Sequence, residues 1–416
     1  MTSKERLECT LAHKAPDRIP LDFGGTAVTG IHVSVVAALR RHFGLESGPV
    51  KVTEPYQMLG EVDDALRDAM GIDTIGVTPR NNMFGFPNEH WKEFRLPWGQ
   101  VVLVPEGFVT TTDAEGSLYI YPEGDASVPP SGKMPRSGFF FDAIIRQDPV
   151  NEEQMDPGDN MEDFTPISDA DLRHFKENVE KAAATGRAVV ATFGGTAFGD
   201  IALVPAINMK HPRGVREIAD WYMLTVSNPD YVHAVFEHQC AVALGNLERI
   251  HAAVGNNVSA VFVCGTDFGT QTSQFCSPDT FRSLYRPYYK RINDWIHRNT
   301  TWKSLKHSCG SVEVLINDFI DAGFDILNPV QIAAAGMDPV RLKEKYGDRI
   351  VFWGGGIDTQ KTLPFGTPGQ VRTEVERLCR IFGKNGGFVF NTVHNIQART
   401  PVENVVAMLE GLRRSG

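Results

Sequence analysis

The sequence predicts an α/β fold, namely a (β/α)8 TIM barrel with a β-hairpin-rich insertion after its second strand. About eight apolar strand segments alternate with helical segments along the 416 residues, and eight strands close such a barrel. A hydrophobic content of 42% supplies enough apolar material for one large core. The competing open sheet is disfavoured, because the turn DFGGTAVTG after the first strand matches G-x-G-x-x-G poorly.

The predicted strands are short apolar runs that end in glycine or polar residues. They cover residues 18–25, 72–79, 187–195, 258–269, 301–310, 325–331, 349–358 and 386–395. Helical patterns separate them, the clearest at 33–44, 63–71, 169–186, 229–255 and 277–299. An N-terminal helix ends where two prolines interrupt APDRIP. We expect all 416 residues to form one domain.

Residues 84–165 depart from this alternation and form the predicted insertion. Alternating apolar residues with frequent turn residues indicate antiparallel hairpins, and the proline-rich segments indicate surface loops. We expect the insertion to cover the catalytic mouth as an apolar lid that excludes water. A dimerisation arm, which would make the chain a homodimer, is the alternative. The lid residues would be Trp91, Phe94, Trp98, Phe108 and Tyr119.

Composition excludes several classes of protein. A net charge of −10 without a dense basic stripe argues against nucleic-acid binding. No uninterrupted apolar run is long enough to span a bilayer. The six cysteines are too widely spread for a disulfide framework, so a cytoplasmic location is expected.

Polar residues gather at the carboxyl ends of the predicted strands, where barrel enzymes carry their chemistry. Arg18 is a candidate for binding an anionic substrate, although an ion pair that anchors the first strand is equally compatible with its position. The other predicted substrate-binding residues at these ends are Asp22, Gly24, Gly25, Asn328, Gln331, Asp358 and Asn395.

Asp267 and Gln271 lie in GTDFGTQ, directly after a strongly apolar strand. A carboxylate there suits a general base or a ligand, and the neighbouring glycines would allow a substrate to approach closely. The alternative is that Asp267 caps the following turn. We expect both residues to take part in catalysis.

His307 and Cys309 form an H-x-C pair at the end of one strand, and His394 ends the last strand. Imidazole and thiolate are the ligands that zinc prefers, so three such groups at one rim predict a zinc site. Two alternatives remain open. In the first, the residues are structural: His307 is hydrogen-bonded to a carbonyl, and Cys309 packs as a small apolar group. In the second, Cys309 is a nucleophile with a His as its base, and Asn395 orients the pair.

Four segments of the chain resemble the uroporphyrinogen decarboxylase superfamily: LAHKAPDRIPLDFGG, GTDFGTQ with SPDTFRSLYRPYYKRI, HSCGSVEVLINDFIDAGFDILNPVQ and GGFVFNTVHNIQARTPVENV. The resemblance covers nearly the whole chain outside the hairpin region and implies a (β/α)8 barrel. It also implies one of two activities. The first is cofactor-free decarboxylation of a tetrapyrrole, and the second is zinc-dependent methyl transfer linked to a corrinoid.

The chain departs from the true decarboxylases in its N-terminal segment. They use an arginine-rich sequence of the type RQAGRY, whereas residues 21–34, LDFGGTAVTGIHVS, contain no arginine. Several substrate carboxylates would then lack a cation, and burying an unpaired charge costs several kcal/mol. A decarboxylase of a smaller carboxylated substrate remains the alternative to methyl transfer, and a non-enzymatic ligand-binding barrel is the third possibility.

The methyltransferase branch is similar at H-x-C, where a His, a Cys and a later Cys hold zinc. His307 and Cys309 match this pattern, and His394 stands where the later Cys falls. The resemblance therefore implies a His-Cys-His zinc site that is less rich in thiolate and more Lewis-acidic. An O- or N-methyl substrate fits such a site better than a thiol. The chain lacks a D-x-H-x-x-G motif, so the corrinoid is expected on a separate partner protein.

Overall fold

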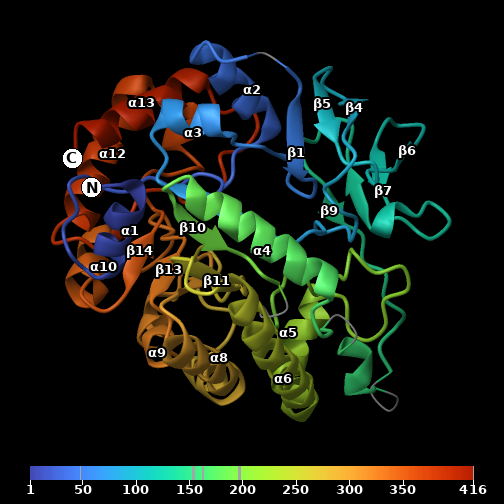
Figure 1. The fold of residues 1–416 in the computed structure, drawn as a ribbon. Helices are drawn as coiled ribbons and strands as arrows, with labels where there is room; N and C mark the ends of the chain where they lie inside the picture. The colour runs from blue at the N-terminus through green and yellow to red at the C-terminus, as the bar shows by residue number, and fades with distance from the viewer. Residues whose placement is uncertain (47, 152–154, 162–163, 195–197, 416) are drawn as a thin grey trace.

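The computed structural model describes residues 1–46, 48–151, 155–161, 164–194 and 198–415. A strongly curled, seven-stranded parallel sheet forms its centre (Figure 1). The strand order is β15-β14-β13-β12-β11-β10-β3. In chain order the strands are β3 (Thr74–Val77), β10 (Ala188–Ala191), β11 (Ala260–Cys264), β12 (Lys303–His307), β13 (Ile326–Asn328), β14 (Val351–Trp353) and β15 (Phe388–Val389).

Residues 20–22 join the two edges of this sheet. Phe390 donates its N–H to the Pro20 carbonyl at 2.8 Å, and Asp73 donates its N–H to the Leu21 carbonyl at 2.8 Å. The predicted first strand thus lies between β15 and β3, although only Leu21 forms a β-bridge, to Phe390. Pro20 has no N–H to donate and Gly24 turns the chain at φ +80°, so the pairing stays short.

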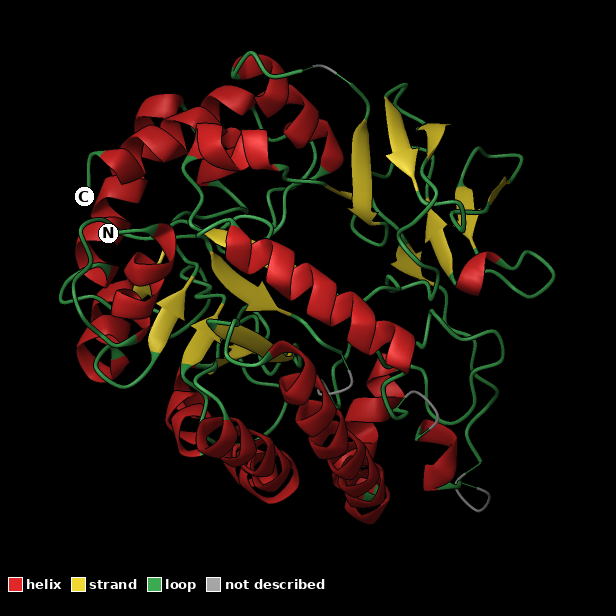
Figure 2. Ribbon diagram, in the orientation of Figure 1, coloured by secondary structure: helices red, strands yellow, loops and turns green. Residues whose placement is uncertain are grey.

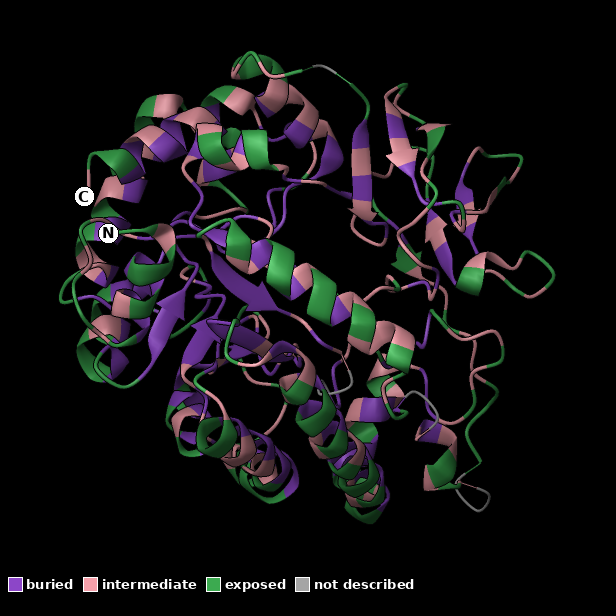
Figure 3. Ribbon diagram, in the orientation of Figure 1, coloured by how far each residue is buried: buried purple, intermediate pink, exposed green. Residues whose placement is uncertain are grey.

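Helices surround the sheet and alternate with its strands (Figure 2). In Figure 3 the parallel strands are buried, whereas the helices carry buried and exposed residues on opposite faces. The longer helices are α1 (Ser3–Leu11), α2 (Val33–His42), α3 (Asp64–Met70), α4 (Asp169–Ala184), α5 (Ile218–Ser227), α6 (Pro229–Val254), α8 (Arg286–Asn299), α9 (Ile316–Asp321), α10 (Pro339–Tyr346), α12 (Pro368–Phe382) and α13 (Val402–Arg413). Shorter helical segments include α7 (Pro278–Thr280), the π-helical turn Phe281–Tyr285 and α11 (Thr362–Phe365).

The core has two parts because successive strand residues face opposite sides of the sheet. Inward-facing residues such as Val190, Leu305 and Val351 pack with Leu7 and Leu11 of α1 in a small cluster. Outward-facing residues join the large cluster beneath the surrounding helices. Helix α1 therefore covers one end of the curled sheet.

Two further sheets lie together on one side of the molecule, at the right of Figure 1. One has the order β2-β1-β5-β4 and the other β6-β7-β8-β9. Their strands are β1 (Val50–Glu54), β2 (Leu59–Gly60), β4 (Lys92–Arg95), β5 (Val101–Val104), β6 (Thr110–Thr112), β7 (Leu118–Ile120), β8 (Gly132–Met134) and β9 (Asp142–Ala143). All pairings except β1–β5 are antiparallel. Strands β1 and β2 precede residue 84, so the first of these sheets extends beyond the predicted insertion.

Within the described residues, no helix combines the length and the apolar character that crossing a membrane requires.

Candidate metal centre

His307, Cys309 and His394 form one cluster. Each offers a donor atom, and these atoms all lie within 4.8 Å of one another. The Cys309 Sγ is 3.5 Å from the His307 Nε2, and the two imidazole rings are 5.6 Å apart at 79°. His307 ends β12 and His394 follows β15, with β13 and β14 between them in the sheet. The curl of the sheet therefore brings the two histidines together, in an arrangement suited to one metal ion.

The His307 ring is held in a single orientation by Asn328 on the neighbouring strand. The Asn328 Nδ2 donates to the Trp353 carbonyl at 2.9 Å, so its Oδ1 faces the ring. The His307 Nδ1 donates to that oxygen at 2.7 Å. The lone pair is then on Nε2, which faces Cys309. A buried hydrogen bond of this kind is how proteins fix the tautomer of a metal-binding histidine.

His394 is arranged differently. Its Nδ1 accepts the backbone N–H of Asn395 at 2.8 Å, so in this arrangement the neutral ring carries its proton on Nε2. Binding a metal through Nε2 would move that proton to Nδ1 and break the contact with Asn395. The Asn395 side chain holds the loop by accepting from the Gly30 N–H at 2.6 Å and donating to the Gln57 Oε1 at 2.8 Å.

Asp267 lies beside the cluster. Its Oδ1 accepts the Cys309 N–H at 2.6 Å and is 3.7 Å from the His307 Nε2. Tyr222 donates its hydroxyl to the Asp267 backbone carbonyl at 2.8 Å. The carboxylate therefore orients the turn that carries Cys309. Gln271, predicted beside it, is exposed, and its backbone carbonyl accepts from the Ala335 N–H at 2.9 Å.

Burial keeps all three cluster donors uncharged near neutral pH. It lowers the pKa of His394 to about 4, with a further contribution from His307. It also lowers the pKa of His307 and, together with the Asp267 charge, raises the pKa of Cys309 well above its usual value. The imidazoles are thus ready to bind a cation, whereas a metal would have to displace the thiol proton.

The loops after β11 and β12 lie in direct contact at this site. A Cβ at Gly310 would overlap the backbone of Gly269, and Gly310 has φ +89°. Only glycine fits such a position. Ser308 Oγ accepts the Phe268 N–H at 2.9 Å, and the Gln331 Oε1 accepts the Gly310 N–H at 2.7 Å. Gln331 therefore supports the turn that carries Cys309.

The remaining predicted substrate-binding residues have structural contacts. Asp22 is fully buried, where it accepts from Thr74 Oγ1 at 2.5 Å, from Trp353 Nε1 at 2.9 Å and from the Gly25 N–H. Burial raises the pKa of Asp22. Asp358 accepts the N–H groups of Gln360 and Lys361 in its own loop. These carboxylates stabilise turns and the barrel interior.

Arg18 lies in an ion-pair cluster with Asp73. Its guanidinium forms a bidentate pair with Asp73, at 2.7 and 2.8 Å, and Asp73 also accepts from Arg6 at 2.7 Å. Asp73 precedes β3, so this cluster is at the amino ends of the strands, opposite His307, Cys309 and His394. The structure has the anchoring ion pair, the alternative left open by the sequence.

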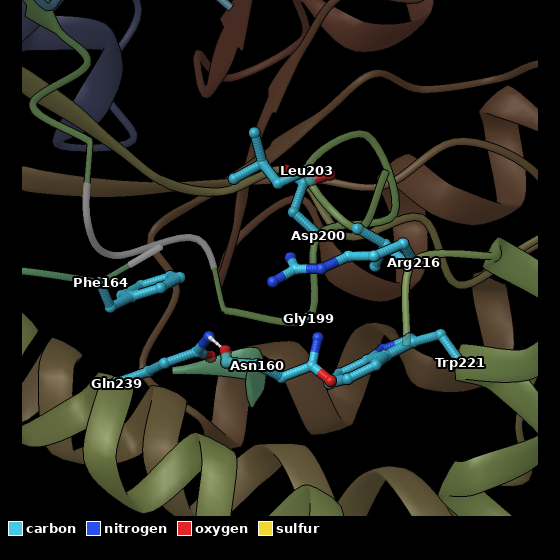
Figure 4. A pocket seen from close by; sticks show the side chains of 9 residues that line it. Asn160, Phe164, Gly199, Asp200, Leu203, Arg216, Trp221 and Gln239 are labelled. Atoms are coloured by element: carbon cyan, nitrogen blue, oxygen red, sulfur yellow. Dashed lines mark hydrogen bonds between the residues drawn. The ribbon is translucent and has the colours of Figure 1, made fainter. Parts of the chain in front are cut away.

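Three residues of this region were not predicted: Tyr222, Asp200 and Lys306. The sequence carried little sign of the first two, because Tyr222 lies in a helix and Asp200 in a loop, both far in sequence from His307, Cys309 and His394. Lys306 directly precedes His307, and a lysine within an apolar strand was the available sign. Asp200 lines a polar cavity with Asn160, Phe164, Gly199, Leu203, Val204, Arg216, Trp221 and Gln239 (Figure 4).

The cavity beside Asp200 is separate from the cluster, since none of the three metal-binding residues lines it. Burial raises the pKa of Asp200 to about 6, with the Asp267 charge adding to the effect. Among the residues that the structure describes, the buried Trp221 Nε1 and Gln239 Oε1 have no hydrogen-bond partner. These groups suit an ordered water molecule.

Comparisons with known proteins agree with the fold. A solved methyltransferase from Methanosarcina mazei superposes with a TM-score of 0.56 at 14% identity, covering 100% of this chain and 99% of that one. A uroporphyrinogen decarboxylase from Anaeromyxobacter dehalogenans is 24% identical over 46% of this chain and 50% of its own. Another, from Herminiimonas arsenicoxydans, is 31% identical over 23% of this chain and 26% of its own. The matched segments thus span half or less of these two relatives.

The model of the uroporphyrinogen decarboxylase (URO-D) family matches residues 146–415, the part that holds the barrel strands from β10 to β15 and all three residues of the cluster. This chain belongs to the URO-D family.

Proposed function

We propose that this protein is a zinc-dependent methyltransferase component that moves a methyl group from a small O- or N-methyl substrate to a corrinoid carried by a partner protein. The observation that carries the proposal is the His307–Cys309–His394 cluster within 4.8 Å. Zinc held there would act as a Lewis acid on the oxygen or nitrogen that loses the methyl group. The full-length likeness to a methyltransferase fold supports the proposal.

The chain's own residues would serve this reaction by holding the donors in place. His307 is oriented by Asn328, and Cys309 by the hydrogen bond from its N–H to Asp267. Asp267 is partly exposed and close to the His307 Nε2, so it is the candidate to contact the substrate or to take a fourth position at the metal. Gln271 is left without a specific role.

Residues 21–34 argue against a tetrapyrrole substrate. His32 is their single basic side chain, and its Nε2 is 2.9 Å from the Phe139 carbonyl. Burial lowers the pKa of His32 to about 4, so it is neutral at physiological pH. The segment therefore offers no cation to pair with substrate carboxylates.

The hairpin region is proposed to shield the site. Phe139 of this region contacts Arg399, which follows the last barrel strand: the Arg399 guanidinium lies over its ring at 5.9 Å, and Trp98 packs against the ring at 5.0 Å. Phe94 and Phe108 pack against each other at 5.2 Å, whereas Trp91 and Tyr119 each lie under a lysine. A dimerisation arm would instead show as a concentration-dependent mass in sedimentation.

The test combines metal content with methyl transfer. Protein purified without chelators is expected to hold about one zinc per chain and to convert reduced cobalamin to methylcobalamin with a small methyl ether or methylamine. Cys309→Ala should lose both properties, whereas Cys9→Ala, a cysteine in α1, should keep both. A folded, metal-free wild-type protein that releases CO2 from a small carboxylic acid would favour the decarboxylase alternative.

A further inference from the structure

Lys306 is buried directly behind the metal-binding cluster. It precedes His307 in β12, and because Leu305 faces the barrel interior, Lys306 faces the surrounding helices. Its exposed fraction is 0%. The ammonium lies over the rings of Phe268, Tyr289 and Phe319 at 4.9, 5.7 and 5.9 Å. Lysine is almost never buried without a role for its charge or its donors.

The Lys306 Nζ donates to two backbone carbonyls and to one cysteine sulfur. It donates to the Thr266 carbonyl at 2.6 Å, to the His307 carbonyl at 2.7 Å and to the Cys264 Sγ at 3.5 Å. Among the residues that the structure describes, no carboxylate forms an ion pair with it. Three donors thus meet three acceptors, namely two backbone carbonyls and the Cys264 sulfur.

These acceptors adjoin the groups of the site. The Thr266 carbonyl belongs to the peptide that precedes Asp267, and the His307 carbonyl to the peptide that follows His307. Two further hydrogen bonds link the same two segments. The Phe268 N–H donates to Ser308 Oγ, and the Cys309 N–H donates to Asp267 Oδ1. The β11–β12 pairing also shifts register between Phe262 and Cys264, a bulge of the kind that re-aims side chains near active sites.

We infer that Lys306 is a positioning residue of the metal centre. Its ammonium ties the end of β11 to the end of β12 and so fixes Asp267, His307 and Cys309 relative to one another. The inference rests on the proposed function, since it assigns Lys306 to the metal site of that proposal. The aromatic rings also hold the ammonium by cation–π attraction.

Positioning and charge predict opposite effects of removing this lysine. Metal binding brings in a divalent cation and releases the Cys309 proton, so the site gains one positive charge. A nearby ammonium opposes that gain, and charge alone predicts tighter metal binding when Lys306 is replaced by a neutral residue. The positioning role predicts weaker binding, because two buried carbonyls lose their donor and the turns shift.

The experiment measures zinc affinity by competition with a chromophoric chelator, and the thiolate-to-metal absorption of the Co2+-loaded protein. Lys306→Met keeps the length and apolar stem of the side chain; zinc affinity should fall at least tenfold, with a weakened Co2+ band. Lys343→Met is the matched control. Lys343 is partly buried and donates to a carbonyl, that of Gly386 at 2.6 Å, but at the amino end of β15. This control should keep wild-type affinity.

Unchanged or tighter zinc binding by Lys306→Met would overturn the inference while leaving the metal site intact. If the wild-type protein binds no zinc, the proposed function fails first, and the inference fails with it. If Lys306→Met does not fold, Lys306→Gln, which keeps one donor group, takes its place. Failure of both variants to fold would assign Lys306 to overall stability and would also overturn the positioning role.

Discussion

The Nδ1 of His307 and the side-chain oxygen of Asn328 lie 2.7 Å apart on the neighbouring strands β12 and β13. This contact is one step of a buried chain of hydrogen bonds. Asp22 accepts from the Trp353 indole, and the Trp353 carbonyl accepts from Asn328. Three residues from three strand segments therefore hold one imidazole. These hydrogen bonds can be broken while His307, Cys309 and His394 stay unchanged, which gives a test of the site.

Replacing Asn328 by Ala should weaken zinc binding about 10–100-fold, because His307 loses the acceptor that fixes its tautomer. Competition with a chelator measures the change. The control is Asn404→Ala, since Asn404 is also a buried amide but donates to the Leu363 and Gly366 carbonyls, away from the site. Equal affinity in both variants would show that Asn328 does not orient His307.

His394→Ala should lose zinc, whereas His394→Cys should retain it, since a thiolate is an equally suitable ligand. A second thiolate makes the site more negative and less Lewis-acidic, so His394→Cys should demethylate an O- or N-methyl substrate more slowly than the wild type. Zinc content, the Co2+ charge-transfer band and initial rates of methyl transfer separate these effects. A His394→Ala variant with full zinc content would remove His394 from the site.

The His307–Cys309–His394 cluster could be predicted from the sequence because its residues follow strand ends and match segments of the methyltransferase branch. His307 and Cys309 follow an apolar strand and His394 follows the last one, and the carboxyl ends of parallel strands meet at one rim. The strand count was predictable for the same reason, since each strand has its own apolar run. The first strand was the least regular, because Pro20 and Gly24 limit its pairing.

Arg18 and Lys306 show what the sequence could not give. Both are basic residues next to strands, and the pattern does not say which end or face of a strand such a residue occupies. Arg18 pairs with Asp73 at the amino ends, through a contact 55 residues away in sequence. Lys306 faces aromatic side chains from three separate segments. Contacts with residues far away in the sequence therefore decide whether such a basic residue has a functional or a structural role.

The Asp73 cluster should control stability without affecting zinc binding. Asp73 is fully buried and accepts from Arg6, Arg18, Ser3 Oγ and the Leu21 N–H. Asp73→Ala leaves Arg6 without its buried partner and should cost about 3–5 kcal/mol. Arg18 is 41% exposed, so Arg18→Ala should cost about 1 kcal/mol or less. Urea unfolding measures both values.

Zinc affinity and methyl-transfer rate are the second readout for this cluster. Both should stay at wild-type values in Arg18→Ala, because the guanidinium lies at the end of the barrel opposite the site. A selective rise in the KM for an anionic substrate, with unchanged kcat, would restore Arg18 as a substrate-binding residue.

Glu54 should make the folded protein less stable as the pH rises through the weakly acidic range. Burial raises the pKa of Glu54 from an ordinary 4.5 to about 7, against the two N–H groups that its carboxylate accepts from Tyr56 and Gln57. Between pH 4.5 and 7 the folded state therefore holds more protons than the unfolded state. The free energy of unfolding falls across this window, by up to about 3 kcal/mol.

Glu54→Gln should remove this pH dependence and cross the wild-type stability curve. An uncharged amide has no ionisation cost, but its single oxygen can accept from only one side, which costs about 1 kcal/mol. The variant should accordingly be less stable than the wild type at pH 4 and more stable at pH 8. Urea unfolding at these two pH values decides the matter: parallel curves that never cross would mean that Glu54 ionises normally in the folded protein.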